Sequence, residues 1–97
     1  EATYYILLAL LTPLHGYGIM QRVAELSSGR LIISAGTLYG ALSTLIEKGW
    51  IEQLAVITDS RKKEYLITDI GLTVLRGEVA RLEELVDNGR KILEQTK

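Results

Sequence analysis

Three consecutive cationic side chains, Arg61, Lys62 and Lys63, form the densest basic cluster in the sequence. They lie between two segments rich in β-branched and aromatic residues, which predicts the turn of a β-hairpin. Cations at a hairpin tip attract phosphate groups over long distances without reading base sequence. Asp59 and Glu64 flank the cluster and dilute its charge, so ordinary solvated surface is the alternative interpretation.

A second candidate surface is a predicted helix over 35–48. Its apolar face is formed by Leu38, Leu42, Leu45 and Ile46. The outward residues are small or carry hydroxyl groups: Ser34 as N-cap, Thr37, Tyr39, Ser43 and Thr44. Hydroxyl groups can donate or accept hydrogen bonds at base edges and phosphates. An ordinary amphipathic helix with a small-residue surface remains the alternative.

The sequence HGYG at 15–18 precedes a predicted helix over 17–28. Tyr17 could place its hydroxyl on a phosphate beside the positive end of that helix, or it could be a half-buried aromatic. His15 is the only histidine and the chain has no cysteine. Because a metal site needs three or four converging donors, we expect His15 to be a loop or capping residue. No nucleophile, base and orienting acid can be assembled, so we predict neither an enzyme nor a cofactor.

Composition limits the remaining possibilities. Ninety-seven residues suit a single small domain. A net charge of −1 gives no global basic field, so any nucleic-acid contact must be local. The longest apolar run, residues 2–12, is shorter than the ~20 residues that span a bilayer, so we expect no membrane association and no secretory signal. The lack of cysteine fits a reducing compartment, and the cytoplasm is the expected location.

The elements that must position these residues follow from periodicity and from chain breakers. Helices are predicted over 2–12, 17–28 and 35–48, then a hairpin with strands 50–57 and 64–67, then a helix over 69–95 capped by Thr68 or Asp69. The predicted class is mainly α with a small β-hairpin: a winged helix-turn-helix over 1–68, followed by a long helix over 69–97. In that fold the third helix enters the major groove of DNA.

The last helix carries a heptad seam, which is an apolar stripe with alternating spacings of three and four residues. Its members are Leu72, Leu75, Val79, Leu82, Val86, Gly89 and Leu93. As a helix, 69–95 would be ~40 Å long and would extend beyond a body of 68 residues. We therefore predict that the seam forms the interface of a homodimer. The alternative is that it packs back onto the first helix.

The residues that carry a family resemblance are YYILLALL, HGYGI, GTLYGAL and RKKEYLIT leading into DIG. Together they cover nearly the whole chain, which resembles the PadR family of bacterial transcriptional regulators, in its short subclass. The resemblance implies a homodimeric repressor that binds palindromic double-stranded DNA and is released by a small molecule. It assigns Tyr17, Ser34, Thr37 and Tyr39 to the helix-turn-helix surface and Arg61, Lys62 and Lys63 to the wing.

This chain departs from the family pattern at three places. Gly40 stands where the family often has proline, and Glu64 stands where a second aromatic commonly precedes Tyr65. Some short members bind planar hydrophobic drugs between subunits by using an aromatic on the last helix, whereas this helix has none and Leu82 is the equivalent residue. A hydrophobic effector pocket is predicted from Tyr4, Tyr5, Leu8, Leu82 and Val86. The alternative function is a winged-helix protein-interaction module without DNA binding.

Overall fold

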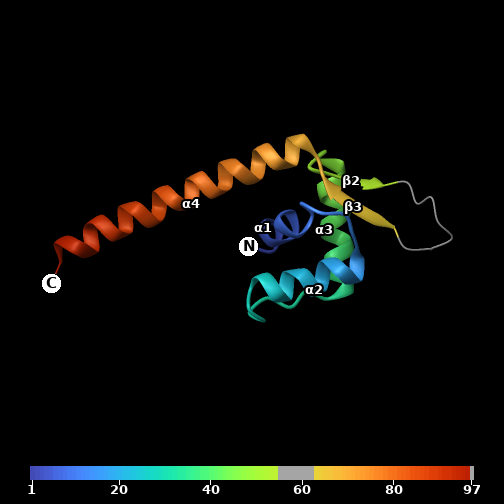
Figure 1. Cartoon of the computed structure of the whole chain (residues 1–97), viewed down its shortest axis with the longest axis horizontal. Helices are drawn as coiled ribbons and strands as arrows, with labels where there is room; N and C mark the ends of the chain where they lie inside the picture. Colours follow the sequence, from blue (N-terminus) through green and yellow to red (C-terminus); the bar gives the residue numbers. More distant parts are fainter. Residues whose placement is uncertain (55–62, 97) are drawn as a thin grey trace.

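The computed structural model describes residues 1–54 and 63–96. Within them the chain forms, in order, α1 (Ala2–Ala9), β1 (Leu14–His15), α2 (Gly16–Leu26), α3 (Ala35–Glu47), β2 (Ile51–Leu54), β3 (Glu64–Ile67) and α4 (Asp69–Gln95). Three helices and the sheet gather into a body, and α4 projects away from it (Figure 1). The predicted mainly α winged-helix fold with a long final helix is confirmed.

Side-chain caps explain where three of the helices begin. Ser34 accepts a hydrogen bond from the backbone N–H of Thr37 at 3.3 Å and so caps α3 as predicted. Thr68 caps α4, with Asp69 in the first turn at the positive end of the helix dipole. His15 caps α2 through Nδ1, which accepts from the N–H of Gly18 at 3.2 Å. The expectation that His15 is a capping residue is confirmed.

Helix α1 ends at Ala9, three residues earlier than predicted. Leu10 is its C-cap, and the chain then turns toward Pro13. Because proline disfavours helical backbone at the residue before it, Thr12 cannot continue the helix. The apolar run over 2–12 therefore divides into a buried helix and an irregular segment in which Leu11 is 51% exposed.

The sheet has three antiparallel strands in the order β1-β3-β2, whereas the sequence predicted only a hairpin. In the additional pairing Leu14 faces Tyr65 and His15 faces Glu64. Strand β1 has two residues, which is too short to show an alternating pattern in the sequence. The hairpin itself pairs Ile51 with Ile67 and Leu54 with Glu64. The predicted strand residues 55–57 lie outside the described ranges.

The core lies between the first three helices, the sheet and the start of α4. Its fully buried side chains include Ile6 of α1 and Leu10 directly after it, Ile19 and Val23 of α2, Leu38 and Leu42 of α3, and Ile51 of β2. Leu45 is buried as predicted, but Ile46 is 40% exposed and does not belong to the core face. At 100° per residue Ile46 lies at the edge of the stripe formed by the three leucines of α3.

Helix α4 has 27 residues and makes the molecule elongated, with extents of 61 × 27 × 19 Å. Only its first turns contact the body, through α1 and β3. Gly71 and Leu75 are its buried residues, and every described residue from Ala80 onward is exposed. The predicted overhang of the last helix is confirmed (Figure 1).

Candidate nucleic-acid interface

The N-terminal turn of α3 presents a pair of hydroxyl groups at the surface. Ser34 Oγ donates to Thr37 Oγ1 at 3.0 Å, and both residues are exposed. Because each hydroxyl has a local partner, the two side chains are held in one arrangement while their remaining acceptor positions stay open to an incoming group. Ser34 and Thr37, two of the residues that the sequence assigned to the reading surface, thus act as one unit, which also caps the helix.

Tyr39 projects from α3 toward the start of α2 and is 49% exposed. Its hydroxyl lies so close to Gly16 that any side chain there would overlap it. Tyr39 also lies near Tyr65 of β3, whose phenol pKa is raised by burial and further by Tyr39. The close approach of Tyr39 therefore requires glycine at position 16, a role that was not predicted from the sequence. The HGYG motif was visible in the sequence, but its contact with Tyr39 depends on the packing of α2 against α3.

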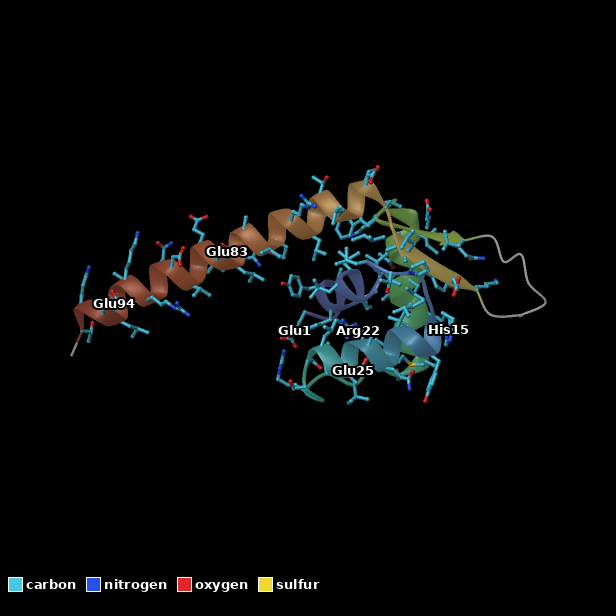
Figure 2. All side chains as sticks on the ribbon, viewed as in Figure 1. Glu1, His15, Arg22, Glu25, Glu83 and Glu94 are labelled. Carbon is cyan, nitrogen blue, oxygen red and sulfur yellow. The ribbon has the colours of Figure 1, made fainter. Side chains whose placement is uncertain are left out.

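Tyr17 and His15 flank Gly16 at the start of α2. Tyr17 is 62% exposed, so its half-buried alternative is wrong. Because His15 Nδ1 accepts the capping hydrogen bond, its other nitrogen can donate when the ring is neutral. Figure 2 places His15 at the end of α2 that lies nearest the strands.

The basic cluster is described only at its last residue. Arg61 and Lys62 lie outside the described ranges, whereas Lys63 is exposed and immediately precedes β3. The first residue of β3, Glu64, pairs with His15. The short strand β1 therefore joins the base of the wing to the start of α2, a connection that sequence reasoning missed because it did not predict β1.

The residues of the predicted effector pocket do not line one common hollow but are divided between two hollows. Tyr4, Tyr5 and Leu82 line one of them, with the two rings edge to face at 5.7 Å between centroids. Leu8 lines the other, together with Leu72 and Val79. Val86 is not among the residues lining either hollow. The division arises because the lining residues of α4 occupy different sides of that helix.

The predicted dimer seam is also divided. Leu75 is buried in the core of its own chain, and Leu72 and Val79 are half-buried and line a hollow together with Leu8. Leu82, Val86 and Leu93 are 37%, 50% and 72% exposed. We call these last three residues the distal seam. Leu85 and Ile92 beside them are 55% and 62% exposed, which widens the apolar stripe.

Membrane-spanning helices and clustered metal ligands are both absent from the described part of the chain. None of its helices combines the length and apolarity that crossing a bilayer requires. Residues 1–54 and 63–96 hold no group of three or more His, Cys, Asp or Glu side chains that could bind a metal ion.

The fold and surface define a winged-helix protein with an appended helix, and comparisons specify its family. Residues 6–77 match the model of the transcriptional regulator PadR-like family. A PadR family regulator from Eggerthella lenta has 31% identity, with 98% of this chain and 82% of that chain covered and a TM-score of 0.77. The chain belongs to the PadR-like family of transcriptional regulators. A comparison with curated proteins found no match.

Two further solved structures are similar. Bacillus subtilis PadR, solved in complex with operator DNA, has 28% identity and a TM-score of 0.67 over 79% of this chain and 45% of that longer chain. A PadR family regulator from Clostridium difficile has 20% identity and a TM-score of 0.78 over 96% of this chain and 99% of that chain. The second likeness concerns the fold alone.

Proposed function

We propose that this regulator is a homodimeric repressor that binds a palindromic operator in double-stranded DNA and is released by a hydrophobic small molecule. In this proposal residues 1–68 bind DNA and residues 69–97 form the dimer. The observation that carries it is that exposed residues occur at the start of α3, at the start of α2 and at the base of the wing, and that these elements are in contact through Tyr39 with Gly16 and through His15 with Glu64. The complex of Bacillus subtilis PadR with operator DNA supports the same use of the fold here.

The chemistry of this surface suits DNA. Ser34 and Thr37 offer hydroxyl groups at the start of α3, and Tyr17 and Tyr39 offer phenols beside the start of α2. The N-terminus of α2 carries a partial positive charge that attracts phosphate. Lys63 adds a full positive charge at the base of the wing. Arg61 and Lys62, which precede it in the sequence, are predicted to contact phosphates in the same way. In this arrangement the residues around α3 would contact phosphates, and α3 itself would contact the edges of the bases.

Dimerisation is supported by the exposed distal seam. An apolar stripe on a helix that leaves its own body is stable in water when another chain covers it, and a two-fold pair is the simplest closed arrangement. A two-fold protein presents two copies of α3, which would favour a palindromic operator. Glu83 and Glu94 mark the projecting part of α4 in Figure 2.

The first experiment selects genomic fragments that the purified protein binds and then measures affinity against salt concentration. We expect Lys63→Glu to weaken operator and non-specific complexes alike. It should also flatten the slope of log affinity against log salt by about one for each phosphate that the variant no longer neutralises. Lys91→Glu, an equal charge reversal far along α4, is the control and should leave the slope unchanged. Thr37→Ala should alter sequence preference and leave the slope nearly unchanged.

A protein-interaction module would respond differently. It would select no genomic fragment, and Lys63→Glu should have little effect on the binding of its protein partner.

The effector is tested separately: apolar dyes or cationic drugs should change the tyrosine or tryptophan fluorescence and the thermal midpoint of the protein. The hollow lined by Tyr4, Tyr5 and Leu82 supports this part of the proposal. Unchanged fluorescence and midpoint would contradict it.

A further inference from the structure

The end of α3 and the start of α4 meet in a hydrogen-bonded joint. Helix α3 closes with Gly49 at a positive φ of 77°, and the N–H of Trp50 donates to the carbonyl of Leu45 at 3.0 Å. This is the Schellman closure of a helix C-terminus. The carbonyl groups of these same two residues, Gly49 and Trp50, then accept hydrogen bonds from the residue that begins α4.

That residue is Thr68, which uses both its side chain and its backbone. Its hydroxyl donates to the carbonyl of Gly49 at 2.6 Å, and its N–H donates to the carbonyl of Trp50 at 2.9 Å. The same hydroxyl accepts from the N–H of Gly71 at 3.1 Å, which caps α4. One side chain therefore connects the last turn of α3 to the first turn of α4, although 19 residues separate Thr68 from Gly49.

Gly71 completes the joint by allowing a close approach. It is buried, and a Cβ on it would overlap the carbonyl oxygen of Trp50 and lie 2.8 Å from Cγ1 of Ile67. Both neighbours are held by the sheet or by the end of α3, so a side chain at 71 would have to tilt the start of α4 away. By contrast, a Cβ on Gly77, further along the same helix, would meet no atom within 4 Å.

A small tilt at this joint has a large effect at a distance. Helix α4 is ~40 Å long, so a tilt of ~5° displaces its far end relative to α3 by ~3.5 Å. This displacement is close to the ~3.4 Å rise between successive nucleotides of one DNA strand. If two chains associate along α4, the angle at the joint controls the distance between their two α3 helices.

We infer that Thr68 and Gly71 are positioning residues that set the half-site spacing recognised by the dimer. They need not touch DNA, because they act through the angle between α3 and α4. This inference rests on the proposed function, and it adds a determinant of operator choice that lies away from the reading surface. It also gives a route by which a displacement of α4 is transmitted to α3.

The test uses the full chain and a series of duplexes in which two selected half-sites are separated by different numbers of base pairs. The wild type should prefer one spacing. Thr68→Val, which removes both side-chain hydrogen bonds, should shift that optimum or lower the preference for it by about fivefold, in line with the loss of one or two hydrogen bonds. Gly71→Ala, which places a methyl group against the carbonyl of Trp50, should shift the optimum or lower the preference as well. Thr68→Ser and Gly77→Ala are the matched controls and should keep the wild-type profile.

The spacing profile separates positioning from general damage. A variant that is merely less stable loses active protein equally at every spacing, so the shape of its profile is unchanged. If Gly71→Ala fails to fold in a melting experiment, Thr68→Val decides. A Thr68→Val profile that superimposes on the wild type would overturn the inference while leaving DNA binding intact. No wild-type binding at any spacing would instead overturn the proposed function, and the inference with it.

Discussion

The two parts of α4 share one sequence pattern but differ in their surroundings. In the near part, over 69–79, the helix contacts α1 and β3, and Leu75 of the seam is 4% exposed. In the distal part, over 80–95, the same spacing continues, but Leu93 is 72% exposed. A heptad stripe therefore specifies that a face will be covered, and it does not specify which surface covers it. In the near part its own chain buries Leu75, and in the distal part the stripe stays exposed within one chain.

The comparison corrects the simplest interpretation of the seam. Leu72, Leu75 and Val79 were predicted to form the dimer interface together with Leu82, Val86 and Leu93. Leu75 is already buried within one chain, because the first turns of α4 pack on the body before the helix leaves it. The alternative of packing within the same chain thus holds for Leu75. Leu75 is therefore not available for the proposed dimer, whereas Leu72 and Val79 are only half-buried and remain in the proposal together with the distal seam.

The largest expected effect comes from truncating the near part. Leu75→Ala should lower the free energy of unfolding by about 2–5 kcal/mol, because it leaves a cavity in the core. Leu93→Ala is the matched control in the distal part and should change it by less than about 0.5 kcal/mol. Denaturant unfolding at low protein concentration, where association contributes least, measures both. Equal losses from the two variants would break the distinction between the parts.

The next effect concerns association rather than folding. Val86→Glu should raise the dimer dissociation constant by at least about tenfold, since covering a valine contributes ~1.5 kcal/mol or more and a buried charge adds a penalty. Arg90→Gln, which changes the net charge equally but lies off the seam, should have little effect. Sedimentation equilibrium at micromolar concentration measures this. A wild-type protein that sediments only as a 10.8 kDa species would contradict the dimer itself.

The smallest effect tests the boundary between the parts. Gly77 is exposed, and a Cβ there meets nothing within 4 Å. Gly77→Ala should therefore stabilise the helix by about 0.5–1 kcal/mol and raise the thermal midpoint by a few degrees. Calorimetry measures the shift. A lowered midpoint would indicate that another chain packs closely at this glycine, and the covered region of α4 would then begin earlier than the distal seam.

Local signals in the sequence determined most of the elements. The caps at Ser34 and Thr68 were readable because a side chain and a backbone N–H only three residues away form them. The single proline located the end of α1 to within three residues. The extent of α4 followed from its period and from the absence of a strong helix breaker. These features depend on neighbours along the chain, which is why residue types and spacing suffice to predict them.

Contacts between distant segments were decided by the tertiary structure. The approach of Tyr39 to Gly16, the pairing of His15 with Glu64, and the joint between Gly49 and Thr68 each require two elements to pack at one particular distance. The sequence states which faces are apolar and which groups can form hydrogen bonds, because these are properties of single residues and of helical period. Which faces meet depends on the shape of the whole core, so the division of the α4 seam could be learned only from the fold.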